Sequence, residues 1–128
     1  MIVILDTSTP LCKLTLIDGD NRKYDEWQAD RNLAKGLLAY LHEQLQTQGK
    51  DWSDIKGIGV FRGPGSFTGL RIGLTVANTI ADAEAIPIVG SDGDDWADDA
   101  ISRLENGQND QVVLPLYGSE AHITKPRK

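Results

Sequence analysis

The sequence predicts a single α/β domain in which a mixed β-sheet of five or more strands carries helices packed on it. Three observations support this fold class. Residues 2–5 form an unbroken apolar run, which is typical of a strand buried on both faces. Residues 32–48 and 67–84 carry apolar side chains at helical spacing. A short apolar run follows each of these two segments, as strands follow helices in α/β proteins.

The first 28 residues predict an antiparallel meander of three strands. Residues 6–10 interrupt the first apolar run with turn-forming residues and Pro10. Residues 11–17 then alternate in polarity, which predicts a second strand. The turn at residues 18–21 leads into a more polar third strand, residues 22–28, which contains Tyr24 and Trp27.

The rest of the chain alternates between helices and strands. A helix at 32–48 has its apolar side chains within about 160° of its circumference and stops at Gly49. A strand at 55–61, a loop at 62–66 and a helix at 67–84 follow, and then a strand at 86–89. Residues 94–104 predict a short helix with Trp96 as its core anchor, and residues 112–116 a last strand.

Composition excludes several classes of site and function. The chain has 128 residues, enough for one domain, and 13 Lys and Arg against 19 Asp and Glu give a net charge of −6. This balance argues against a protein that binds nucleic acid alone. Cys12 is the only cysteine, and His42 and His122 are far apart, so the sequence predicts no metal or cofactor site. The opening residues do not resemble a signal peptide, and no apolar run approaches the length of a membrane span, so we expect a cytoplasmic protein.

The helix predicted at 67–84 is apolar around almost its whole circumference. Its polar side chains form one narrow stripe, Arg71, Thr75, Asn78 and Asp82. Small residues recur every four positions, at Gly69, Gly73, Ala77 and Ala81, where another backbone could approach closely. A helix of this kind is buried on most sides, either by its own chain or by a partner protein. Periodicity alone leaves both readings open.

The loop before this helix contains the most specific pattern in the chain. On physical grounds it is a rigid loop that leads into a helix N-terminus, where an anion can bind. The run Gly63-Pro64-Gly65-Ser66-Phe67-Thr68-Gly69-Leu70-Arg71-Ile72-Gly73 closely resembles the signature of the TsaB (YeaZ) family of bacterial tRNA threonylcarbamoyladenosine biosynthesis proteins. Residues 6–9, 86–90 and 115–117 are also similar to family segments.

This resemblance implies one lobe of the actin/Hsp70-like (ASKHA, ribonuclease H-like) fold in residues 1–91. Residues 92–118 would supply a short helix and a terminal strand in place of the family's second lobe, and residues 119–128 a basic tail. In actin-like folds the nucleotide lies between two lobes, and one lobe buries too little of it, so we expect no nucleotide cofactor. Asp6, which aligns with the metal-side acid of nucleotide-binding relatives, is expected to serve as a turn and cap residue. Leu33-Ala34-Lys35 stands where the family often has His-Ser-Glu.

The function that the resemblance implies is that of a non-catalytic scaffold in tRNA threonylcarbamoyladenosine synthesis. It would dimerise with a TsaD-like catalytic subunit, with a TsaE-like ATPase in the same complex, and would meet tRNA only through that complex. The predicted partner interface is Leu33, Leu37, Leu41, Gly69, Gly73 and Ile80. The alternatives are a self-associating homodimeric scaffold with another role, and a peptidase M22-like or ATPase enzyme. Lys125, Arg127 and Lys128 are expected to form an auxiliary tRNA contact or, alternatively, a solvated tail.

Overall fold

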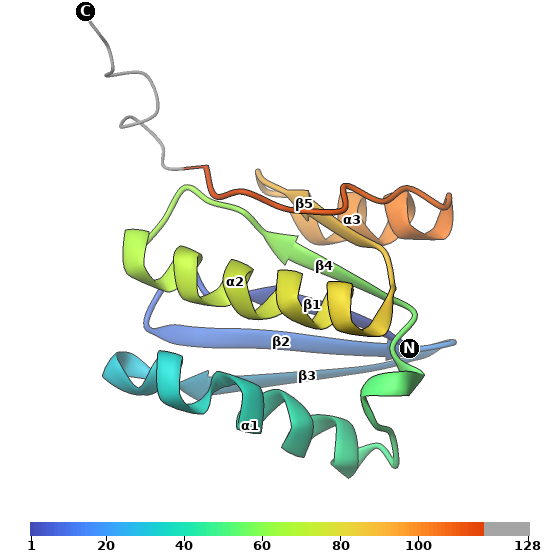
Figure 1. The fold of residues 1–128 in the computed structure, drawn as a ribbon, viewed down its shortest axis with the longest axis horizontal. Coiled ribbons are helices and arrows are strands. Elements are labelled where there is room, and N and C mark those ends of the chain that lie inside the picture. Colours follow the sequence, from blue (N-terminus) through green and yellow to red (C-terminus); the bar gives the residue numbers. More distant parts are fainter. Residues whose placement is uncertain (117–128) are drawn as a thin grey trace, which may run out of the picture.

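The computed structural model describes residues 1–116, which fold around one five-stranded mixed sheet (Figure 1). Its strands, in the order β3-β2-β1-β4-β5 across the sheet, are β1 (Ile2–Asp6), β2 (Leu11–Asp18), β3 (Asn21–Gln28), β4 (Gly57–Phe61) and β5 (Ile88–Ser91). β1, β2 and β3 pair antiparallel as the predicted meander, and β4 and β5 run parallel to β1. The predicted α/β class and mixed five-stranded sheet are confirmed.

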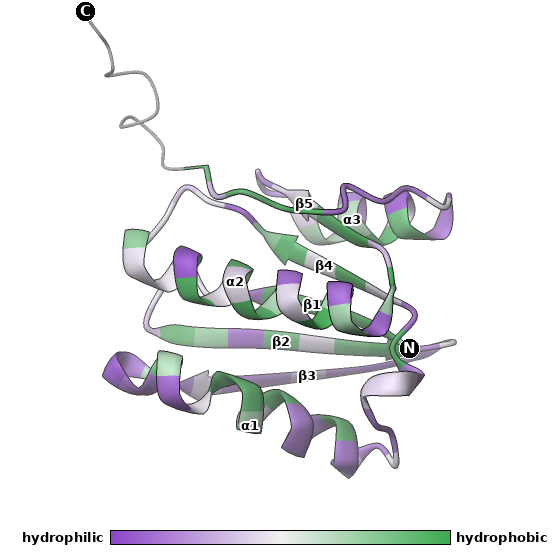
Figure 2. Ribbon diagram, viewed as in Figure 1, coloured by the Kyte–Doolittle hydropathy of each residue, from purple (hydrophilic) through white to green (hydrophobic). Residues whose placement is uncertain are grey.

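Helices cover both faces of this sheet. Helices α1 (Leu33–Thr47) and α2 (Phe67–Glu84) lie side by side on one face, and α3 (Trp96–Glu105) packs on β4 and β5 from the other (Figure 1). Because successive strand residues point to opposite faces, Val3 and Leu5 of β1 join the core under α1 and α2, whereas Ile4 joins the core under α3. Figure 2 shows the resulting pattern, with hydrophobic strands β1 and β2 beneath helices whose polar residues face outward. Within residues 1–116 no helix is both long and apolar enough to cross a bilayer.

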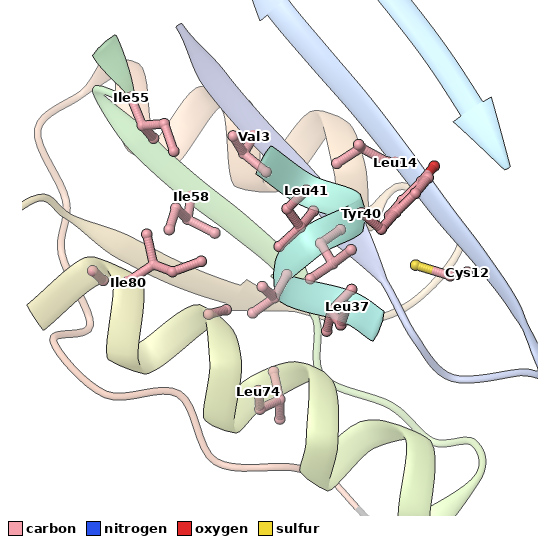
Figure 3. Close-up of a cluster of buried hydrophobic side chains, with 14 of the residues drawn as sticks. Val3, Cys12, Leu14, Leu37, Tyr40, Leu41, Ile55, Ile58, Leu74 and Ile80 are labelled. Carbon is pink, nitrogen blue, oxygen red and sulfur yellow. The ribbon is translucent and has the colours of Figure 1, made fainter. Parts of the chain in front are cut away.

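The larger core fills the space between the sheet and the first two helices (Figure 3). Leu37 and Leu41 of α1 share this core with Ile58 of β4 and with Leu74 and Ile80 of α2, and both are almost completely buried. At the β3 side, Tyr40 stacks on Trp27 with ring centroids 5.0 Å apart and donates a 2.5 Å hydrogen bond to Asp25. These contacts hold α1 against β3 at the edge of the sheet.

Most predicted elements form within a few residues of their predicted bounds. The strand predicted at 55–61 begins at Gly57, because residues 52–54 form a 3₁₀ turn that Asp51 caps. The strand predicted at 86–89 is shifted to Ile88–Ser91, since Pro87 precedes the ladder. The predicted helix anchor Trp96 is partly buried on the second core and lies 5.4 Å from the ring of Phe61.

The strand predicted at residues 112–116 is wrong. This segment runs along α2 and β5 as irregular chain and joins no ladder (Figure 1). The side-chain amide of Asn78 holds it, accepting from Val113 N and donating to Val113 O, both at 2.9 Å. Pro115 has no N–H to give a ladder, and side chains already occupy the open edge of β5. Tyr117 and the predicted basic tail lie outside the described residues.

Candidate functional site: the signature loop and the outer face of two helices

The signature loop connects β4 to the N-terminus of α2. Ser66 caps the helix, its hydroxyl oxygen accepting from Gly69 N at 3.2 Å. The Gly63–Pro64 peptide bond is cis, and Gly63 has φ +116°, a conformation that L side chains rarely adopt. A Cβ at Gly63 would also overlap the carbonyl oxygen of Leu116. Glycine is therefore required at this position by both conformation and space.

The signature glycines pack against the two residues that follow β1. Ser66 N donates to Ser8 O, and Thr7 Oγ1 donates to Gly69 O, both at 2.8 Å. A Cβ at Gly65 would stand 2.5 Å from Ser8 Cβ, and one at Gly73 would stand 2.8 Å from Thr7 Cβ. Gly69 and Gly73 thus accommodate the chain's own β1–β2 turn, whereas Ala77 and Ala81 pack in the core. The sequence had suggested the approach of a partner helix there.

The structure buries all six residues predicted to contact a partner. Leu33, Leu37, Leu41 and Ile80 are at most 8% exposed, and Figure 3 shows the last three within the core. Gly69 and Gly73 face Thr7. The sheet and α2 cover Leu33, Leu37 and Leu41 of the first helix, so these three leucines are unavailable to another protein. Any partner surface on these helices must therefore use their other residues.

Two large apolar residues of α1 and α2 are exposed to solvent. Leu38 and Phe67 are each 54% exposed. Two adjoining hollows between the helices share Ala34 of α1 with Thr68 and Ile72 of α2, and Val76 extends one of them. Leu38 follows Ala34 by one helical turn and so lies on the same side of α1. We call Ala34, Leu38, Phe67, Ile72 and Val76 the outer face.

Polar signature residues border this outer face. The guanidinium of Arg71 lies over the ring of Phe67, 5.3 Å from its centroid, one turn into α2. Arg71, Thr68 and Thr75 are exposed and line the hollow beside Ile72. The signature therefore has two sides, with glycines facing the chain's own turn and Phe67, Thr68 and Arg71 facing outward.

The titratable groups near β1 have structural roles. Asp6 Oδ1 accepts from Ser8 N at 2.8 Å, so Asp6 caps the turn as predicted. Burial, with the nearby carboxylates of Asp6 and Asp25, raises the pKa of the Cys12 thiol to about 12. Burial and the hydrogen bond to Asp25 likewise raise the pKa of Tyr40. Among residues 1–116, no three His, Cys, Asp or Glu side chains gather as a metal site would require.

Comparisons with known proteins show which family this chain resembles. The family described as TsaD, tRNA N6-adenosine threonylcarbamoyltransferase, matches residues 27–92, about half of the chain. The Escherichia coli tRNA threonylcarbamoyladenosine biosynthesis protein TsaB is 34% identical over 90 residues, which are 70% of this chain and 38% of that protein. The chain belongs to the TsaB (YeaZ) family.

Further members of the family show how much of their length this chain represents. TsaB of Bacillus subtilis is 30% identical over 123 residues, which are 91% of this chain and 49% of that protein. The structure of YeaZ from Pseudomonas aeruginosa superimposes with a TM-score of 0.67 at 31% identity, over 71% of this chain and 43% of that one. The chain thus spans less than half the length of these family members.

Sequence analysis missed the structural roles of two pairs of residues, one beside the signature loop and one at the β5 edge. Thr7 and Ser8 are polar and buried, and their position directly after a buried strand was the available signal. Arg103 and Asp110, which hold the segment after α3 to β5, carry no motif that identifies them. Their pairing depends on how the chain returns after α3, which periodicity does not encode.

Proposed function

We propose that the chain is a non-catalytic subunit in the synthesis of threonylcarbamoyladenosine in tRNA, and that it binds a TsaD-like catalytic subunit through its outer face. The observation that carries the proposal is the exposed apolar surface that α1 and α2 form beside the family signature. The names of the family members support the pathway. In this role the chain would act in the cytoplasm, where tRNA is found.

The outer face has the chemistry of a docking surface for helices. Leu38 and Phe67 leave large apolar areas in water, and Ile72 and Val76 on the same helix pair are only partly buried; grouped apolar patches of this kind mark interaction sites. Burying a whole leucine or phenylalanine side chain is worth about 1.5–3 kcal/mol, so about half of that remains available at each. Two partner helices laid on α1 and α2 would complete a four-helix arrangement.

The catalytic and tRNA-binding groups would come from the partner. The net charge of −6 opposes binding of the tRNA backbone by this chain alone, because phosphate contacts need clustered Lys and Arg. In the described residues, Cys12 is buried with a raised pKa, and Asp6 is used as a cap. A TsaE-like ATPase would be a further member of the same assembly.

Binding of the TsaD homologue from the same genome tests the proposal. Isothermal titration should show binding by the wild type and at least 10-fold weaker binding by Leu38→Lys and by Val76→Lys. Ala39→Lys is the matched control, since Ala39 is exposed on the same helix but lines the hollow towards β3. It should bind like the wild type.

Two results would contradict the proposal. Binding that Leu38→Lys and Val76→Lys leave intact would remove the outer face from the interface. Failure of the wild type to bind TsaD, together with self-association that Leu38→Lys abolishes, would assign the same face to the alternative homodimer. Circular dichroism of each variant shows that the fold is retained.

A further inference from the structure

The outward edge of β5 is hydrogen-bonded without a neighbouring strand. β5 is the last strand of the sheet, and Pro87 O and Ser91 O bond to β4 and to the residue that follows it. Because backbone groups alternate sides along a strand, the N–H and C=O groups of Ile88 and Gly90 point away from β4. All four of these groups nevertheless have partners.

Three residues supply those partners, and we call Arg103, Asn109 and Asp110 the clasp. Ile88 N donates to Asn109 Oδ1 at 3.1 Å, and Ile88 O accepts from Asp110 N at 2.8 Å. Gly90 N donates to Asp110 Oδ2 at 2.9 Å, and Gly90 O accepts from Arg103 Nη1 at 2.8 Å. The clasp thus presents the same alternation of donors and acceptors that an added strand would present.

Two residues of the clasp, Arg103 and Asp110, form an ion pair that is partly exposed to solvent. Arg103 Nη2 lies 2.5 Å from Asp110 Oδ1, and their side chains are 25% and 33% exposed. Only one of the four bonds to the β5 edge, that of Asp110 N, is between backbones. The edge is therefore closed mainly by side chains, which can be removed by substitution without interrupting the sheet.

We propose that the β5 edge is a strand-pairing surface kept closed by the clasp, and that a second copy's β5 pairs with it when the clasp opens. An antiparallel arrangement would place Ile88 of one copy opposite Gly90 of the other. The four outward groups of each copy would then bond to each other in a self-complementary, two-fold pair.

The composition of β5 favours pairing with the β5 strand of a second copy. Its residues Ile88, Val89, Gly90 and Ser91 are uncharged and buried, so two copies would meet without like charges opposite one another. Natural edge strands are protected against such pairing by charged side chains and covering segments. Here β5 itself carries no charge, and Arg103 and Asp110 provide that protection. Because β5 has only four residues, we expect the association to be weak and to depend on concentration.

Amide hydrogen exchange and molar mass together test this inference. In Asn109→Ala/Asp110→Ala, which removes the side-chain acceptors of both amides, the Ile88 and Gly90 amides should exchange at least 10-fold faster at low micromolar concentration than in the wild type. At several hundred micromolar, light scattering should show twice the mass and the same two amides should again be protected. Asp98→Ala and Glu105→Ala, at exposed positions of α3 outside the clasp, should match the wild type.

Several outcomes would overturn the proposal. Unchanged exchange at Ile88 and Gly90 in the double variant would show that the clasp does not close the edge. Fast exchange with monomer mass at every concentration would show that the open edge does not pair. A dimer whose two amides stay unprotected would be formed elsewhere. If the double variant does not fold, Asp110→Ala alone is measured at the Gly90 amide, which loses its side-chain acceptor, with the same criteria for exchange and molar mass.

Discussion

Substitution of Gly73 by alanine distinguishes an intrachain role of the signature glycines from a partner-binding role. Gly73 lies in the interior of α2, and its added Cβ would stand 2.8 Å from both Cβ and Cγ2 of Thr7 and overlap Oγ1. Thr7 is 3% exposed and donates its hydroxyl proton to Gly69 O, so it cannot move without breaking a buried hydrogen bond. We therefore expect Gly73→Ala to destabilise the isolated chain.

Three terms set the size of the effect. Replacing glycine by alanine inside a helix stabilises it by about 1 kcal/mol. Overpacking a close-packed site costs about 1–3 kcal/mol. Leaving the Gly69 carbonyl or the Thr7 hydroxyl without its buried partner costs about 1–3 kcal/mol more. The free energy of unfolding should thus fall by about 1–5 kcal/mol.

Urea denaturation followed by circular dichroism measures this change. Gly36→Ala is the matched control, because the nearest atom to its Cβ, at 2.8 Å, belongs to the Trp27 ring, a side chain that can shift. It should cost less. Thr7→Ala should cost stability alone but less in the Gly73→Ala background, since it removes the overlapping hydroxyl and methyl groups. A Gly73→Ala chain about 1 kcal/mol more stable than the wild type would refute the reasoning.

Three further predictions concern the core and the segment after α3. Asn78→Ala should lower the free energy of unfolding by about 1–3 kcal/mol, measured in urea, because Val113 N and O lose their partner; Thr79→Ala is the control. Cys12, with its pKa raised to about 12, should react with a thiol reagent at pH 8 only as fast as the chain unfolds. Stability should fall as pH rises above about 9, because the pKa values of Cys12 and Tyr40 are higher in the fold than in the unfolded chain. Below that pH these two groups make their full contribution to the free energy of unfolding. Urea titrations that show constant stability from pH 8 to 11 would contradict this prediction.

The sequence predicts the order and type of most elements because local patterns decide them. The apolar run 2–5, the alternation in 11–17 and the helical periodicities each specify burial on one or two faces. The class and mixed sheet follow from that order. The family signature adds the lobe architecture, which the YeaZ comparison supports.

What the sequence does not predict depends on contacts between distant residues. The sequence correctly placed an apolar stripe on α1 and a stripe of small residues on α2. Periodicity, however, does not show which part of the protein packs against each stripe. Thr7 packs against Gly69 and Gly73 of α2, and the sheet packs against the buried leucines of α1. Residues 112–116 have a strand-like composition, but hydrogen bonds from distant residues hold them outside the sheet. Asn78, 35 residues away, bonds to Val113, and Asp110 occupies the edge of β5.

The most direct measurement of the proposed role is threonylcarbamoyladenosine formed in tRNA by a reconstituted system containing the cognate TsaD. Nucleoside mass spectrometry should detect the product when the wild-type chain is present and much less when the chain is omitted or replaced by Leu38→Lys. Ala39→Lys should support the wild-type amount. Equal product with and without the chain, in a system whose TsaD is active, would contradict the account.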